Sequence, residues 1–172
     1  MKIVYFSHSD IFSNKANVVH VLNMCSAFIN CGHSVKLFVW RNKKYKLIKK
    51  NYKKILDAYD LNYNFKICNY PSISPYGNSF ISSFFLSQIL DSNEVDFIIG
   101  RNLRACFFLS NKIPVYYETH QPFSYYNFLD RFLFNRLVRR KRFVSLITIS
   151  DYLINDYNKI SIFKGINKLR LR

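Results

Sequence analysis

A chain of 172 residues with an apolar fraction of 49% can bury the core of one ordinary domain, which excludes intrinsic disorder. The formal net charge of +16 favours anionic partners, either phospholipid headgroups or nucleic acid. The four cysteines form no CxxC pair and show no metal-ligand spacing, so we expect buried thiols and no metal site.

Most of the positive charge lies in three segments. Residues 41–54, 131–142 and 158–172 together hold 19 of the 26 lysine and arginine residues. A basic surface of this kind attracts phosphate groups. Enrichment in lysine and asparagine also follows from biased base composition, however, and most charge runs are solvated faces. Both interpretations stay open.

Neither a secretory signal nor a membrane span is expected. The apolar start at residues 3–6 is too short for a signal peptide, so we expect a cytoplasmic chain. Residues 67–90 carry no charge, but Pro71, Pro75 and Gly77 interrupt them, whereas a bilayer helix needs about 20 predominantly apolar residues.

The first 40 residues predict a β-α-β unit. An apolar strand at residues 3–6 is followed by a polar loop, a helix that ends at Gly32, and a second apolar strand at residues 35–40. The helix carries one apolar stripe, formed by Val18, Val21, Leu22, Cys25, Phe28 and Ile29. Such a unit implies two parallel strands, with the ligand crevice at the loop after the first strand.

The remaining chain continues the alternation of strands and helices. Strands are expected at residues 65–68, 97–99, 115–117 and 146–149, and helices within residues 41–62, 79–90, 103–109, 124–143 and 151–157. The pattern predicts one doubly wound α/β domain over residues 1–157, with a mostly parallel, Rossmann-like sheet. Residues 158–172 are expected to be a basic tail that includes a weak strand at residues 160–163.

Polar side chains that follow the strands are the candidate site, because a parallel sheet aims its carboxyl ends into one crevice. Three clusters qualify, after the first, fourth and fifth strands. Neither a GxGxxG nor a GxxxxGK[ST] motif is present, which disfavours a dinucleotide or P-loop site. The candidate residues are Ser13, Asn14, Lys15, Asn17, His20, Arg101, Asn102, Glu118 and His120.

Three of these candidates have side chains suited to distinct chemistry. The imidazole of His120 can bind a sugar hydroxyl or transfer a proton near neutral pH. Arg101 can pair with a phosphate or carboxylate, or alternatively form a salt bridge with Glu118 or Asp96. His20 can contact a ligand, or can be a partly exposed surface residue.

Several segments, in order along the chain, resemble the amino-terminal domain of family 4 glycosyltransferases of the GT-B fold. They are residues 2–9, 13–21, 27–35 with the pattern Gly-His-x-Val, 96–102, 116–122 with the sequence YYETHQP, and 147–150 before a helix. The resemblance implies one half of a GT-B fold that binds the acceptor.

The resemblance also implies the reaction and its participants. Such an enzyme transfers a sugar, typically a hexose, from a nucleotide-sugar donor to an acceptor with retention, in cell-surface polysaccharide or glycolipid synthesis, and no metal or other cofactor is implied. The loop from Ser13 to Asn17 would lie against donor phosphates or acceptor, and His120 near the reacting carbon. The basic surface would suit a lipid-linked acceptor and peripheral docking at the anionic inner face of the cell membrane.

The donor-binding domain of that family has no counterpart in these 172 residues. We therefore expect a chain that is inactive alone: a truncated or split gene product, an isolated domain, or a subunit completed by a second chain. An alternative is a non-catalytic module that binds a membrane or a partner. Nucleic-acid binding is not expected, because no RNA- or DNA-binding motif accompanies the charge and the 30 Phe and Tyr residues.

Overall fold

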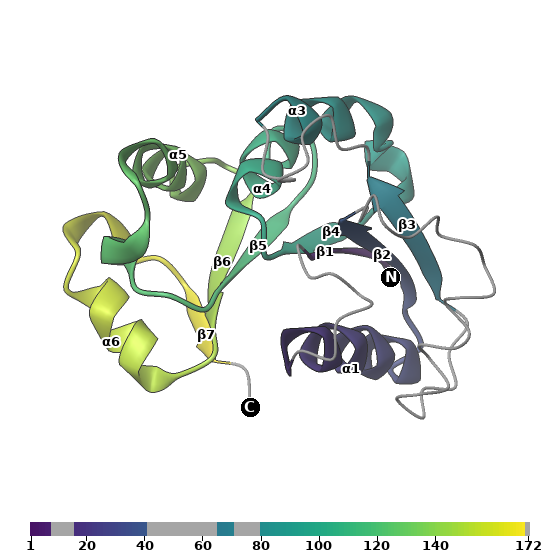
Figure 1. Ribbon diagram of the computed structural model, residues 1–172, viewed down its shortest axis with the longest axis horizontal. Helices are drawn as coiled ribbons and strands as arrows, with labels where there is room; N and C mark the ends of the chain where they lie inside the picture. The colour runs from purple at the N-terminus through teal and green to yellow at the C-terminus, as the bar shows by residue number, and fades with distance from the viewer. Residues whose placement is uncertain (8–15, 41–64, 71–79, 171–172) are drawn as a thin grey trace.

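The computed structural model describes residues 1–7, 16–40, 65–70 and 80–170, and these contain one seven-stranded sheet (Figure 1). The strand order is β3-β2-β1-β4-β5-β6-β7, and every neighbouring pair is parallel. The predicted Rossmann-like α/β fold is thereby confirmed. The strands are β1 Lys2–Ser7, β2 Ser34–Trp40, β3 Lys66–Tyr70, β4 Phe97–Gly100, β5 Val115–Thr119, β6 Phe143–Thr148 and β7 Lys168–Arg170.

Helices cover both faces of the sheet. In Figure 1, α1 lies on one face, and α3, α4 and α5 lie on the other. The α-helices of the described residues are α1 Ala16–Asn30, α3 Phe80–Ile89, α4 Leu103–Leu109, α5 Phe128–Val138 and α6 Asp151–Asn158. Short 3-10 segments are η1 Ser92–Glu94, η2 Phe123–Tyr125 and η3 Ser161–Phe163. No helix among these residues is both long and apolar enough to cross a bilayer.

Side-chain alternation in the strands divides the core into two layers. In β1, Ile3 and Tyr5 pack toward α1, whereas Val4 and Phe6 pack toward α4 and α5. All four side chains are at most 1% exposed, as expected for a central parallel strand covered on both faces.

The apolar stripe predicted for the first helix is confirmed. Val18, Val21, Leu22 and Cys25 are buried, and the two later members of the stripe pack at the edge of the same cluster. The helix ends as predicted at Gly32, whose φ of 80° is easily reached only by glycine. The whole of the helix expected within residues 41–62, with its basic segment, lies outside the described residues.

Several boundaries differ from the sequence prediction, among them those of the fifth strand and of the helix after it. The fifth strand was expected to stop at Tyr117, but β5 continues to Thr119, because Glu118 and Thr119 pair with Ile147 and Thr148 of β6. A helix was expected over residues 124–143; α5 instead begins after Asn127, whose side chain accepts a hydrogen bond from the Asp130 amide (2.8 Å). It ends at Val138, so that Phe143 can begin β6.

The segment after α6 also differs from expectation. No strand forms at residues 160–163, where η3 turns the chain and buries Phe163 completely against Phe134 and Tyr157 (centroid distances 5.0 and 4.9 Å). The chain then adds β7, which pairs in parallel with β6. Much of the expected basic tail is therefore built into the core and the sheet.

Candidate functional site

A cavity of about 400 Å³ opens at the carboxyl ends of β4 and β5, beside the first turn of α1. Its lining includes Asn17, Arg101, Asn102, Glu118, His120 and Gln121. This is the edge of the sheet where a doubly wound fold binds its ligands. Asn17, from the first turn of α1, therefore lies at the same cavity as residues that follow β4 and β5.

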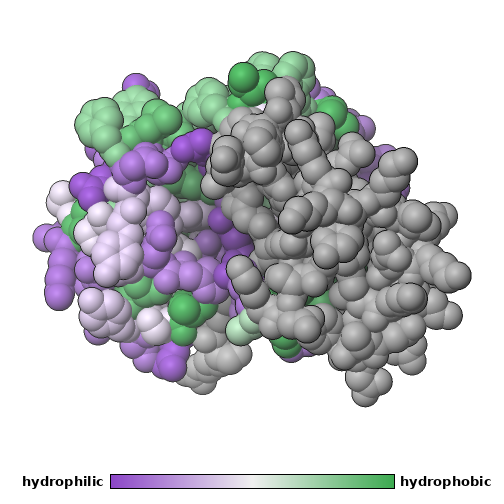
Figure 2. Space-filling view, viewed as in Figure 1, coloured by the Kyte–Doolittle hydropathy of each residue, from purple (hydrophilic) through white to green (hydrophobic). Residues whose placement is uncertain are grey.

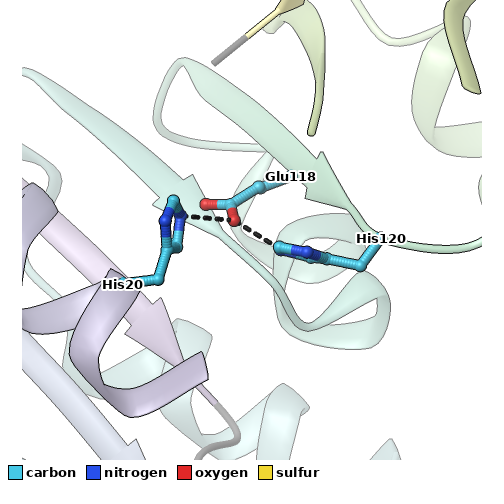
Figure 3. A group of neighbouring side chains, drawn as sticks. All are labelled: His20, Glu118 and His120. Carbon is cyan, nitrogen blue, oxygen red and sulfur yellow. Dashed lines mark hydrogen bonds and ion pairs between the residues drawn. The ribbon is translucent and has the colours of Figure 1, made fainter. Parts of the chain in front are cut away.

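Glu118 is the centre of the site. Its side chain points from β5 between two imidazoles, with its Oε1 3.1 Å from His20 Nε2 and 2.5 Å from His120 Nε2 (Figure 3). The hydroxyl of Tyr5 donates to the other oxygen, Oε2. Arg101 completes the set, with its Nε 3.4 Å from Oε1. A carboxylate only 1% exposed is thus held by three hydrogen bonds, from Tyr5, His20 and His120, and by one ion pair with Arg101.

These contacts determine the charge state of Glu118. Burial by itself would raise the pKa of the carboxyl group. Hydrogen bonds from His120, His20 and Tyr5, together with the positive charge of Arg101, outweigh burial and hold the pKa of Glu118 well below its usual range. The group is therefore ionised at neutral pH.

An ionised Glu118 fixes the orientation of both histidines. A carboxylate only accepts hydrogen bonds, so His20 and His120 must each donate through Nε2–H. In the neutral imidazole this leaves Nδ1 as the hydrogen-bond acceptor. The two rings lie nearly edge to face, with centroids 5.9 Å apart. Glu118 thus selects one tautomer and one ring position for each histidine.

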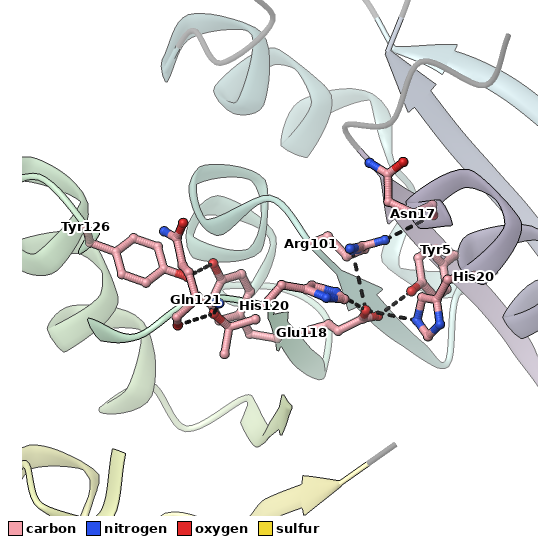
Figure 4. Close-up of polar contacts among 10 residues, drawn as sticks. Tyr5, Asn17, His20, Arg101, Glu118, His120, Gln121 and Tyr126 are labelled. Atoms are coloured by element: carbon pink, nitrogen blue, oxygen red, sulfur yellow. Dashed lines mark hydrogen bonds and ion pairs between the residues drawn. The ribbon is translucent and has the colours of Figure 1, made fainter. Parts of the chain in front are cut away.

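Arg101 bridges the site to the start of α1. Besides Glu118, it contacts the Asn17 carbonyl, which accepts from Nη1 at 3.3 Å (Figure 4). Of the two salt bridges considered from the sequence, the one to Glu118 is present, whereas Asp96 accepts from the Lys2 amide at 2.7 Å. The predicted contact between Arg101 and a phosphate stays a prediction.

The other predicted residues divide into three cases. Asn102 lines the cavity, but its side chain caps α4 by accepting from the amides of Arg104 (3.0 Å) and Ala105 (3.2 Å). Asn17 lies in the first turn of α1 and also lines the cavity. Ser13, Asn14 and Lys15 lie outside the described residues.

Sequence reasoning missed a group of hydroxyls behind His120. The Tyr126 hydroxyl lies 2.8 Å from both Tyr117 Oη and Thr119 Oγ1, and the Tyr157 hydroxyl donates to the Gln121 carbonyl at 3.0 Å. These bonds hold the turn after β5, where Gln121 follows His120 (Figure 4). The signal available in the sequence was the presence of hydroxyl-bearing residues within otherwise apolar stripes.

Tyr5 was also missed, because its place in the run Ile3-Val4-Tyr5-Phe6 indicated only a buried strand. Burial and the adjacent Glu118 charge both raise the pKa of Tyr5, so the phenol stays protonated and acts as a donor. Tyr5, on the α1 face of the central strand, therefore supports the site by donating a hydrogen bond to Glu118.

His20, Glu118 and His120 also offer ligand atoms of the types that bind divalent cations, within 4.8 Å of one another. In the described structure the same atoms bond to each other, and the guanidinium of Arg101 adds a positive charge beside Oε1. A cation would have to replace both histidine hydrogen bonds and lie near that charge. The arrangement is that of a hydrogen-bonded cluster.

Comparison with known proteins adds one informative likeness. No protein-family model matches the sequence, and no curated protein matches it significantly. Among solved structures, the chain is similar to Alr3699/HepE of Anabaena, determined in complex with UDP and glucose, with a TM-score of 0.60 and 12% sequence identity. The match covers 92% of this chain and 41% of that protein, so this chain spans about two fifths of its length. At this identity the likeness shows the Rossmann-like fold.

Proposed function

We propose that the chain is the acceptor-side half of a glycosyltransferase, which transfers a sugar from a nucleotide-sugar donor to an acceptor. The observation that carries the proposal is the Glu118-centred histidine pair, which faces a cavity at the carboxyl edge of a parallel sheet. The likeness in fold to a protein solved with UDP and glucose supports the same assignment.

In this proposal His120 is the residue closest to the chemistry. Its Nε2 is committed to Glu118, so Nδ1 is the atom that would accept a hydrogen bond from a sugar or acceptor hydroxyl. Glu118 is a positioning residue, because it acts through the ring it orients. His20 lies on the other side of the same carboxylate and would bind rather than react.

The diphosphate of the donor would be bound at the start of α1. Amide groups of the first turn of a helix favour anions, and the guanidinium of Arg101 lies beside Asn17 in that turn. The loop from Ser13 to Asn17 would complete this subsite together with a donor-binding half. We infer no metal requirement, since Arg101 supplies positive charge at this position.

The finer features of the reaction follow the same proposal. Transfer would proceed with retention, to an acceptor that is lipid-linked and used in polysaccharide or glycolipid synthesis. The enzyme would work at the cytoplasmic face of the cell membrane. A non-catalytic module that binds a membrane or partner is the second candidate, and the exposed apolar face of α3 is the observation that favours it.

Saturation-transfer NMR on the full chain tests the binding part of the proposal. We expect UDP-glucose to receive saturation at its glucose protons, and this signal to fall severalfold in His120→Ala. The matched control is His33→Ala, which removes an imidazole that contacts Phe28 at the turn after α1, away from the cavity. Equal signals from the two variants would contradict the role of His120.

The transfer reaction requires the donor-binding half. Mixing the chain with a separately produced donor-binding domain, and following release of UDP, should reveal turnover that His120→Ala abolishes and His33→Ala retains. Turnover that persists in His120→Ala would remove this residue from the reaction.

A further inference from the structure

The outer surface of α3 has the reverse of the usual polarity. A surface helix of a globular protein normally directs its apolar stripe into the core. In α3 the buried positions are mostly serines, whereas five large apolar side chains are between 41% and 68% exposed. The buried residues are Ser82, Ser83, Leu86 and Ser87, and the exposed apolar ones are Phe80, Ile81, Phe84, Phe85 and Ile89. Figure 2 shows hydrophobic surface at the top of the molecule, over α3.

Contacts within the chain hold the phenylalanine rings on the outer side of α3. The hydroxyl of the buried Ser87 donates to the Phe84 carbonyl at 2.6 Å, so the polarity of this inward residue is satisfied within the helix. The half-buried ring of Phe108 on α4 lies edge to face with Phe80 and Phe84, at centroid distances of 4.7 and 5.6 Å. The outward apolar surface is therefore a fixed part of the fold.

The exposed side chains of α3 form two ridges, each with a spacing of four residues, which we call the α3 face. One ridge is Phe80, Phe84 and Gln88, and the other is Ile81, Phe85 and Ile89. Ridges of this spacing interlock when two helices cross at about −50°, the commonest class of helix packing. Phe84 and Phe85 lie at the middle of the helix, so apolar side chains extend to both sides of its centre. Such a face can pack against a copy of itself.

The charge of the chain limits where two copies can meet. At a formal net charge of +16 two copies repel each other, so they can associate only through a region without charge. The α3 face meets this condition, because no residue from Phe80 to Ile89 is charged. The ammonium group of Lys112 lies beside the helix but donates to the Ser87 carbonyl at 3.2 Å. Two α3 faces in contact therefore place no like charges of their own opposite one another.

The size of the α3 face is that of a dimer contact. A phenylalanine side chain has roughly 150–250 Å² of surface, and the three rings of α3 are between 41% and 48% exposed. Together with Ile81 and Ile89 they leave about 500 Å² of apolar surface on each copy. Contact between two such faces removes about 1,000 Å² from water, the size above which specific protein interfaces form.

We propose that the α3 face is the interface of a homodimer. The α3 helices of two copies pack against each other in antiparallel directions, about a two-fold axis that passes between their Phe84 and Phe85 side chains. None of the residues described in α3 lines the cavity at Glu118, so each copy keeps its site open. The inference does not depend on sugar transfer, because it is argued from residues outside the histidine cluster.

Sedimentation velocity of the full chain over a range of concentrations tests the proposal. We expect a species of twice the chain mass that dissociates on dilution. Added salt should strengthen the dimer, because it screens the repulsion between two strongly basic chains and leaves the apolar contact in place. A chain that stays monomeric over its whole soluble range overturns the proposal. Binding of that monomer to phosphatidylglycerol vesicles would assign the α3 face to lipid instead.

Two charged variants at the centre of the face test the two-fold arrangement. Phe85→Lys and Phe85→Glu should each raise the dissociation constant of the dimer by more than about a hundredfold, because the change removes apolar contact and acts twice across the axis. An equal mixture of the two variants should form a dimer again, since opposite charges then meet at the axis. Phe85 is about half exposed, so thermal melting should show that both variants keep the fold. A mixture that stays monomeric overturns the proposed arrangement.

Matched controls come from exposed rings on other helices. Tyr152→Ser removes a ring that is 70% exposed on α6, which Figure 1 shows well apart from α3. Phe128→Ser removes a ring that is 88% exposed at the start of α5. Both variants should form the dimer as the wild type does. A dimer that Phe128→Ser dissociates and Phe85→Lys leaves intact would overturn the assignment to the α3 face.

Discussion

Replacing Glu118 by glutamine tests the centre of the site. The change keeps the size of the side chain but removes the negative charge that Tyr5, His20, His120 and Arg101 surround. The amide NH2 group that replaces one carboxylate oxygen is itself a hydrogen-bond donor, so in the variant it would face the donor groups that surround the side chain. The variant loses charge-assisted hydrogen bonds and leaves Arg101 without its carboxylate partner.

The expected loss can be estimated from these contacts. A hydrogen bond to a charged group contributes about 1.5–3 kcal/mol, and removing one partner of a buried ion pair costs about 3–5 kcal/mol. The contacts share one carboxylate and are not additive, so we expect Glu118→Gln to lower the free energy of unfolding by about 2–4 kcal/mol. Against a typical total of about 5–15 kcal/mol, this is easily measured.

The assay is urea unfolding of wild type and variant over a range of pH. Because the folded-state pKa of Glu118 lies below its unfolded value of about 4.3, its contribution is fully present above that pH and is lost as pH falls toward the folded pKa. The stability difference between wild type and Glu118→Gln should therefore be widest near pH 7 and should narrow in acid.

A matched control is Glu94→Gln, which removes an exposed carboxylate paired with Lys36 at 2.9 Å. Water screens that ion pair, so we expect Glu94→Gln to lower the free energy of unfolding much less than Glu118→Gln does. Imidazole nitrogen NMR adds a direct readout, because both histidines of the wild type should carry the Nε2–H tautomer and Glu118→Gln should disturb it. A free energy of unfolding of Glu118→Gln equal to that of the wild type at pH 7 would refute the reasoning. So would a difference between the two proteins that is as large at pH 3 as at pH 7.

Two further predictions concern residues that support the site and the core. Tyr5→Phe removes one donor to Glu118 without changing the packing of β1, and we expect a loss of about 1–2 kcal/mol in urea unfolding; an unchanged midpoint would contradict the contact. Phe163→Ala should cost about 3–5 kcal/mol, because its fully buried ring packs on Phe134 and Tyr157, and hydrogen exchange should show β7 losing protection first. Exposed Phe128→Ala is the control and should leave stability nearly unchanged.

The sequence by itself determined the local elements and their order. The stripe at Val18, Val21, Leu22 and Cys25 fixes which face of α1 is buried, and Gly32 fixes where the helix ends. Both signals lie within a few consecutive residues, where the helical period and a positive φ act directly. The alternation of such segments with apolar strands was enough to predict a parallel α/β sheet.

The same local reasoning placed some boundaries wrongly. It ended the fifth strand before Glu118, because a charged residue after an apolar run normally marks the end of a strand. It also predicted a strand at residues 160–163, where Phe163 instead turns inward to fill the space beside Phe134. In both places a contact distant along the chain decided the conformation.

Only the tertiary structure brought the site together. His20 and Glu118 are 98 residues apart, and Tyr5 and Glu118 are 113 apart; they meet because β4 pairs with both β1 and β5. The outward apolar face of α3 is likewise a result of packing, since its sequence of serines and phenylalanines does not state which side meets the core. Local periodicity is encoded in neighbouring residues, whereas the meeting of distant side chains depends on the strand order that the whole chain adopts.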